Sequence, residues 1–143
     1  SEEGIGKKLE GVDFQEKAIE IGKKLHPDLT LKQGDIYKLE YKNNSFDLVM
    51  ATEVLEHLKD PLKGLKELIR VSRKYILLSV PNEPFFMGAN FLRGKNLSRW
   101  GNDIEHIQHW TSSRFEEFVI GQGLKVIKKR HPFPWTMLLL SKI

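Results

Sequence analysis

The chain alternates short apolar runs with longer segments in which apolar residues recur at helical spacing. The short runs are typical of β-strands, and they lie at residues 9–12, 29–31, 46–50, 75–80, 124–127 and 136–140. Helical spacing predicts helices over residues 15–25, 61–71 and 112–122. Strands that alternate with helices in this way indicate an α/β fold with a mostly parallel sheet.

The later strands refine this picture of the sheet. The runs at 46–50 and 75–80 are largely apolar, which is typical of strands that are covered on both faces. The last two strands are joined only by the short stretch at 131–135, and a parallel crossover needs a dozen residues or more. We therefore expect the last two strands to form an antiparallel pair at the edge of the sheet.

Composition places the chain among globular proteins and excludes several kinds of chemistry. It has 143 residues, of which 40% are hydrophobic and 29% are charged, and this is the size of one domain. The absence of cysteine excludes disulfides, thiolate zinc sites and cysteine nucleophiles. Residues 81–110 contain no clear strand, so we expect a lid or acceptor-binding insertion there within a single domain over 1–143.

Charge and hydropathy narrow the possible partners. The 23 basic and 19 acidic residues leave a formal charge of +4, and the basic residues are scattered, so a nucleic-acid partner is not favoured. No apolar run approaches the ~20 residues of a membrane-spanning helix. The first residues have no apolar core of the kind found in signal peptides, and we expect a cytoplasmic protein.

Acidic residues follow three of the predicted strands. Asp13, Asp35 and Glu53 each come at or just after a strand, and ligands of open α/β sheets bind beyond the carboxyl ends of the strands. Asp13 could accept hydrogen bonds from both hydroxyls of a ribose, and Asp35 could accept one from the exocyclic amine of a purine. Helix capping is the alternative for each acid alone. Three acids together favour a nucleoside ligand.

Five segments carry a resemblance to a known family. They are GVDF at 11–14, GDI at 34–36, SFDLV at 45–49, EVLEHL at 53–58 followed by Asp60-Pro61, and HWT at 109–111. In order and spacing the chain resembles the class I S-adenosylmethionine-dependent methyltransferases, in particular the type-11 group. The resemblance implies a Rossmann-like sandwich with an antiparallel C-terminal strand pair.

The resemblance also implies a site for S-adenosylmethionine. Asp13 would hold the ribose hydroxyls of the cofactor, and Phe14 would flank its adenine. Asp35 and Ile36 would be the adenine-binding pair. The methionine side would be lined by Ala51, Thr52 and Glu53.

One family feature is missing. The first strand, the glycine-rich loop that follows it and most of the first helix have no counterpart, because no apolar run precedes Gly4 and Gly6. Either these residues belong to a longer protein, which we favour, or the chain is a degenerate relative that cannot bind the cofactor.

The segment EVLEH suggests a divalent metal. If a helical turn begins near Glu53, then Glu53, Glu56 and His57 fall on one face, and His106 could be a fourth ligand. This arrangement resembles that of small-RNA terminal 2′-O-methyltransferases, and ubiquinone-pathway O-methyltransferases have a similar segment. The alternative is that Glu56 and His57 only pack and hydrogen-bond at the wall of the site.

The expected reaction is methyl transfer to a small molecule, with oxygen preferred over nitrogen as the acceptor atom. His57, His106 and His109 are the candidate general bases, because the pKa of histidine suits neutral pH. Aromatic residues that include Phe133 and Trp135 form either core and lid packing or a small apolar acceptor pocket. The rival functions are a non-catalytic binding module, an RNA 2′-O-methyltransferase and, on a related sheet, a nicotinamide dehydrogenase.

Overall fold

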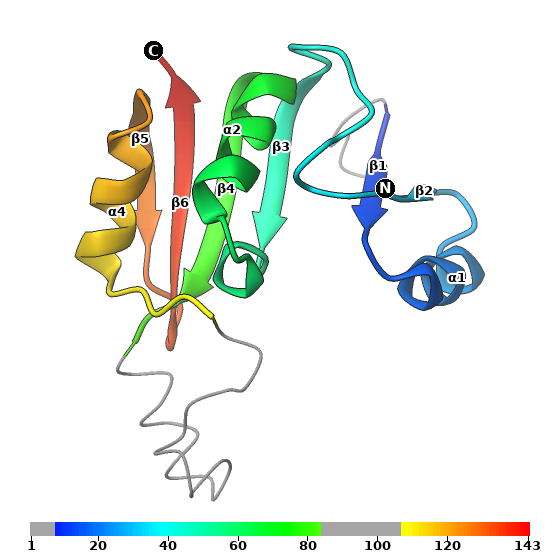
Figure 1. Ribbon diagram of the computed structural model, residues 1–143, viewed down its shortest axis with the longest axis horizontal. Coiled ribbons are helices and arrows are strands. Elements are labelled where there is room, and N and C mark those ends of the chain that lie inside the picture. The colour runs from blue at the N-terminus through cyan, green and yellow to red at the C-terminus, as the bar shows by residue number, and fades with distance from the viewer. Residues whose placement is uncertain (1–7, 84–106) are drawn as a thin grey trace, which may run out of the picture. The chain divides into compact units, whose positions relative to one another are not determined.

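The computed structural model describes residues 8–83 and 107–143 (Figure 1). The chain divides into two compact units, Ser1–Glu40 and Tyr41–Ile143, and each is described by itself. Gly4, Gly6, His106 and most of the predicted insertion at 81–110 lie outside the described residues. No helix in the described ranges is long and apolar enough to cross a membrane.

The first unit is a parallel strand pair with one helix. Strand β1 (Glu10–Asp13) leads into α1 (Glu16–Leu25), and β2 (Thr30–Gln33) then returns to pair with β1 in parallel. The Leu31 side chain of β2 lies next to Gly11 of β1 and Gly22 of α1. A Cβ built at Gly11 or at Gly22 would come within 2.7 Å of a Leu31 methyl carbon, so both glycines allow close packing at this residue.

The second unit contains a four-stranded mixed sheet. Its strands are β3 (Phe46–Thr52), β4 (Ser72–Pro81), β5 (Leu124–Arg130) and β6 (Trp135–Lys142), in the order β3-β4-β6-β5. β3 and β4 are parallel, whereas β6 runs antiparallel to both β4 and β5. The predicted antiparallel C-terminal pair is therefore confirmed. Figure 1 shows the carboxyl ends of β3 and β4 at the same end of the sheet as the start of β6.

Three helices accompany this sheet among the described residues, and two of them have side-chain caps. The short 3₁₀ helix η1 (Leu55–His57) precedes α2 (Pro61–Val71), and α4 (Ser112–Ile120) precedes β5. The Lys63 amide donates to Asp60 Oδ1 over 2.9 Å at the start of α2. The Arg114 amide donates to Thr111 Oγ1 over 3.3 Å at the start of α4. Both caps satisfy amides that a helix start leaves without partners.

The core of the second unit lies between its helices and the central strands. Its fully buried side chains include Leu65 of α2, Ile76 and Leu78 of β4, Phe115 of α4, and Leu138 and Leu140 of β6. β4 is mostly buried, as its apolar run predicts. The same expectation is wrong for β3, because Leu48 and Met50 remain 42% and 59% exposed. β3 is the edge strand of this sheet, and the described residues cover only one of its faces.

Candidate functional site

The first unit places two acidic residues at neighbouring strand ends. Asp13 ends β1, and its Oδ1 accepts a hydrogen bond from the Gln15 amide over 2.7 Å. Asp35 follows β2, and its Oδ1 accepts one from the Tyr37 amide over 2.8 Å. The Gly34 amide donates to the Asp13 carbonyl over 2.9 Å, which ties the two strand ends together. Each carboxylate keeps its Oδ2 without a hydrogen bond within the described residues.

The residues around these acids form an exposed rim. Phe14 is 76% exposed, and its carbonyl accepts a hydrogen bond from Gln33 Nε2 over 3.0 Å. Ile36 is partly buried. A Cβ at Gly34 would lie 2.7 Å from Val12 Cγ1, so the chain turns closely over β1 at this glycine. An aromatic ring and two carboxylate oxygens therefore reach the surface at one end of the strand pair.

In the second unit, Glu53 is fixed by two hydrogen bonds to its carboxylate. Ser79 Oγ donates to Oε1 over 2.8 Å, and Trp135 Nε1 donates to Oε2 over 2.7 Å. The backbone φ of Glu53 is +56°, in the left-handed region that residues with a side chain rarely adopt. The Glu53 amide also donates to the Ser79 carbonyl over 3.2 Å. Contacts from β4 and β6 thus hold an unfavourable backbone conformation at the end of β3.

The two residues before Glu53 differ in exposure. Ala51 is buried and Thr52 is exposed, as expected for alternating positions of a strand. Only Thr52 and the partly exposed Glu53 could therefore meet a ligand through their side chains.

Glu56 carries a buried carboxyl group. The residue is 1% exposed, and neither Oε1 nor Oε2 has a hydrogen-bond partner among the described residues. Burial raises the pKa of Glu56 to about 8, and the negative charge of Glu53 adds to the rise. The Glu56 side chain is therefore mainly a neutral carboxylic acid at pH 7. Its carbonyl accepts hydrogen bonds from the amides of Ile107 and Gln108, both 2.9 Å long.

The predicted metal set is not assembled from its described members. The metal set depended on a helical turn that begins near Glu53, but η1 begins at Leu55 and the carboxylate of Glu53 is directed to Ser79 and Trp135. Within residues 8–83 and 107–143, no three His, Cys, Asp or Glu side chains are grouped so that they could hold a metal. Glu53, Glu56 and His57 therefore do not form a metal centre there, and His106 lies outside the described residues.

Two candidate bases lie beside buried carboxyl groups. His57 Nε2 is 3.9 Å from Glu56 Oε1, and His109 Nδ1 is 3.9 Å from Glu83 Oε1. Both distances are longer than a hydrogen bond. Both imidazoles are partly exposed, whereas Glu56 and Glu83 are buried.

The segment at 107–110 joins the two imidazole–carboxyl pairs. The amides of its first two residues donate to the backbone carbonyl of Glu56, and the Glu83 amide donates to the Trp110 carbonyl over 2.8 Å. The ring of Trp110 packs on α4, with centroids 5.6 Å from Phe115 and 4.8 Å from Phe118. His57 and His109 consequently lie beside the ends of β3 and β4, at the end of the sheet where Glu53 is placed.

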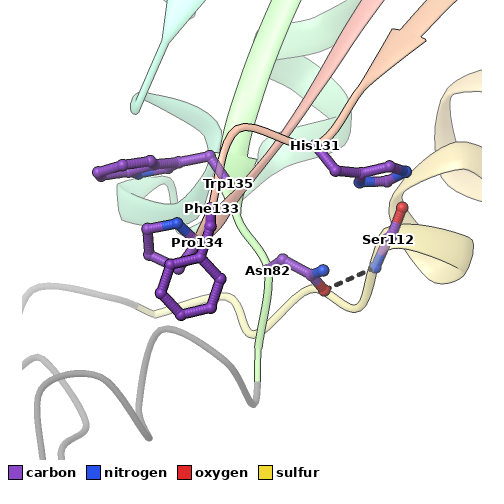
Figure 2. A pocket seen from close by; sticks show the side chains of 6 residues that line it. All are labelled: Asn82, Ser112, His131, Phe133, Pro134 and Trp135. Atoms are coloured by element: carbon purple, nitrogen blue, oxygen red, sulfur yellow. Dashed lines mark hydrogen bonds between the residues drawn. The ribbon is translucent and has the colours of Figure 1, made fainter.

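A cavity of about 340 Å³ opens at the same end of the second unit (Figure 2). It is lined by Asn82, Ser112, His131, Phe133, Pro134 and Trp135. The pattern of aromatic residues in the sequence pointed to Phe133 and Trp135, but nothing in it singled out the polar residues. Asn82, Ser112 and His131 come from three separate segments, and only the tertiary structure brings them together.

The comparison with protein families identifies the class of the chain. A family model described as a methyltransferase domain (Methyltransf_11) matches residues 2–77, which is more than half of the chain. The chain belongs to this family. The matched region includes both strand-end acids of the first unit and the segment from Ala51 to His57.

Curated relatives and solved structures agree with this class. A ubiquinone/menaquinone biosynthesis C-methyltransferase of Bdellovibrio bacteriovorus is 41% identical over 46 residues, which is 32% of this chain and 20% of the relative. A demethylmenaquinone methyltransferase of Renibacterium salmoninarum is 34% identical over 62 residues, which is 43% of this chain and 26% of the relative. The chain thus spans about a quarter or less of the length of these two relatives.

The solved structures establish the fold. Magnesium protoporphyrin IX methyltransferase from Synechocystis, with bound S-adenosylhomocysteine, superposes with a TM-score of 0.74 at 14% identity, covering 96% of this chain and 65% of that one. A methyltransferase from Thermotoga maritima superposes with a TM-score of 0.72 at 15% identity, covering 98% of this chain and 84% of that one. The predicted Rossmann-like fold with mostly parallel strands is confirmed.

Proposed function

We propose that the chain functions as an S-adenosylmethionine-dependent methyltransferase that acts on a small molecule with an oxygen-bearing ring. The observation that carries this proposal is the pair of acids at the ends of β1 and β2, in a segment that the methyltransferase family model matches. Paired carboxylates at the ends of parallel strands suit the hydroxyl and amine donors of a nucleoside.

The side chains of the first unit fit the nucleoside part of the cofactor. Asp13 uses only Oδ1 for its own chain, so Oδ2 is left to accept from ribose hydroxyls. Asp35 has the same arrangement and would accept from the adenine amine. The exposed ring of Phe14 would cover one face of the adenine, with Ile36 as its partner.

In the second unit, considered by itself, Thr52 and Glu53 are the residues that the family resemblance assigns to the methionine end of the cofactor. When bound, S-adenosylmethionine supplies a methyl group whose bond to a positively charged sulfur breaks as an electron pair of the acceptor takes the carbon. Glu53 would bring a negative charge toward that positive sulfur or the amino group. Its position is held by Ser79 and Trp135 before any ligand arrives, so little reorganisation is needed.

The acceptor is proposed to be a quinol-type ring, on the support of the names of the demethylmenaquinone methyltransferases. Removal of the proton from a ring hydroxyl makes both the oxygen and the neighbouring ring carbon nucleophilic. A base therefore serves either acceptor atom, and His57 and His109 are the described candidates for it. The preference for oxygen over nitrogen stays a prediction, since one relative is named as a C-methyltransferase and another as an N-methyltransferase.

Calorimetry with S-adenosylhomocysteine tests the cofactor assignment. We expect micromolar binding to the wild-type chain and a loss of about tenfold or more in Asp13→Asn and in Asp35→Asn, because a carboxylate–hydroxyl or carboxylate–amine hydrogen bond contributes about 1.5–3 kcal/mol. Asp28→Asn makes the same change at an exposed acid away from the strand ends and is the matched control.

Two results would contradict the proposal. One is the absence of any binding heat with wild-type protein that is shown to be folded by circular dichroism. The other is equal affinity in Asp13→Asn, Asp35→Asn and Asp28→Asn. A methyl-transfer assay with 1,4-naphthoquinol then tests the acceptor class, and methylated product detected by mass spectrometry is the expected result.

A further inference from the structure

The cavity of the second unit has one polar and one apolar side. Figure 2 shows Asn82, Ser112 and His131 on one side and the rings of Phe133, Pro134 and Trp135 on the other. Its volume of about 340 Å³ lies at the lower end of the roughly 300–1,000 Å³ found for small-molecule sites. The cavity therefore suits a compound of one or two rings.

The orientation of the Asn82 amide is determined by its neighbour. The Ser112 backbone amide donates to Asn82 over 3.1 Å, and this donor can bond only to the carbonyl oxygen of the side chain. The amide nitrogen of Asn82 is then left as a donor, and it makes no hydrogen bond within the described residues. A ligand oxygen that accepts a hydrogen bond complements this group.

The apolar side connects the cavity to Glu53. Trp135 lines the cavity, and its Nε1 donates to Glu53 Oε2 over 2.7 Å. One indole thus contacts both the cavity and the carboxylate that we place at the methionine end of the cofactor. A ring held against Trp135 and Phe133 would lie one side chain away from that carboxylate.

From this arrangement we propose that the cavity binds the ring of the methyl acceptor. The acceptor would be a planar aromatic or quinoid compound, and an oxygen attached to its ring would accept a hydrogen bond from Asn82 Nδ2. The inference rests on the proposed function and adds to it a position for the acceptor. The rings of Phe133 and Trp135 would pack on the faces of the ligand, and Asn82 would select compounds that carry an oxygen. His131 would border the open side of the cavity.

Calorimetry with 1,4-naphthoquinone tests the site, because the oxygens of this probe can only accept hydrogen bonds. Naphthalene is the companion probe without oxygen. We titrate each probe into the chain both alone and with excess S-adenosylhomocysteine, and in both cases we expect naphthoquinone to bind at least tenfold more tightly than naphthalene. The chain has no cysteine, so the addition of thiols to the quinone does not interfere.

Asn82→Asp is the most informative variant. It keeps the oxygen that accepts from the Ser112 amide and replaces only the donor, so the start of α4 is preserved. We expect at least a tenfold loss of naphthoquinone affinity, little change for naphthalene, and affinity for S-adenosylhomocysteine within twofold of wild type. Asn43→Asp is the matched control, because it adds the same charge at an exposed position that lies before β3.

Phe133→Leu tests the apolar side separately, and it is expected to weaken both ring probes by about threefold or more. The site assignment is overturned if naphthoquinone and naphthalene bind equally, if Asn82→Asp behaves like Asn43→Asp, or if no ring probe binds at millimolar concentration. If the ring probes behave as expected but S-adenosylhomocysteine does not bind to wild-type chain, the ring site stands and the methyltransferase function is refuted.

Discussion

The buried carboxyl of Glu56 gives the sharpest prediction about stability. An unfolded chain exposes this group to water, where its pKa has the ordinary value of 4.5, whereas burial raises the pKa to about 8 in the folded protein. Between these two values, unfolding releases a proton that the folded state retains. The free energy of unfolding must therefore fall as the pH rises through this window.

The magnitude follows from the separation of the two pKa values. Each pH unit inside the window lowers the free energy of unfolding by at most about 1.4 kcal/mol. With a folded pKa near 8, the loss between pH 5 and pH 8 comes to about 3–4 kcal/mol. The stabilisation is complete below pH 4.5 and is lost as the pH approaches 8.

Glu56→Gln removes this titration while it keeps the shape of the neutral acid. We expect the free energy of unfolding of the variant to match that of wild type within about 1 kcal/mol at pH 5 and to exceed it by about 3–4 kcal/mol at pH 8. Urea unfolding followed by circular dichroism at pH 5, 6, 7 and 8 measures the difference. Glu117→Gln makes the same change on the exposed face of α4 and is the control. A difference between Glu56→Gln and wild type that stays constant over these four pH values would refute the reasoning.

Three further substitutions test other contacts. Asp60→Ala removes the cap of α2 and should lower the free energy of unfolding by about 1 kcal/mol in urea titrations, whereas a neutral effect would show that the cap contributes nothing. Ser79→Ala removes one of the two hydrogen-bond donors to the Glu53 carboxylate, so the same titrations should show that the free energy of unfolding falls by about 1.5–3 kcal/mol. An unchanged free energy of unfolding would show that this hydrogen bond contributes nothing. Gly34→Ala places a methyl group against the stiff side chain of Val12, so we expect a lower melting temperature and weaker binding of S-adenosylhomocysteine, and unchanged values would contradict the close packing.

Local patterns in the sequence were enough to place most of the elements. The helix at Pro61–Val71 matches its predicted bounds, and each predicted strand is present with ends that differ by a few residues. This is possible because apolar periodicity and capping residues act within one turn or one strand. The acids at the ends of β1 and β2 were found in the same way, since a residue that follows a strand must lie at its end.

The expectation for residues 53–57 failed because the conformation of Glu53 depends on distant residues. A helical turn from Glu53 is locally reasonable, but Ser79 and Trp135 bind its carboxylate from positions 26 and 82 residues further along the chain. These hydrogen bonds accompany a left-handed backbone and a 3₁₀ helix that begins later. No spacing rule within the segment contains this information.

The sequence alone determined the class of fold, the order of its strands and helices and the presence of acids at the ends of β1 and β2, because each of these is encoded in neighbouring residues. Only the tertiary structure decided that Glu56 is buried and mainly neutral, and that Asn82, Phe133 and Trp135 line one open cavity. Burial and the lining of a cavity depend on which segments the sheet brings together. They arise from packing between residues far apart in the chain, which a one-dimensional pattern does not specify.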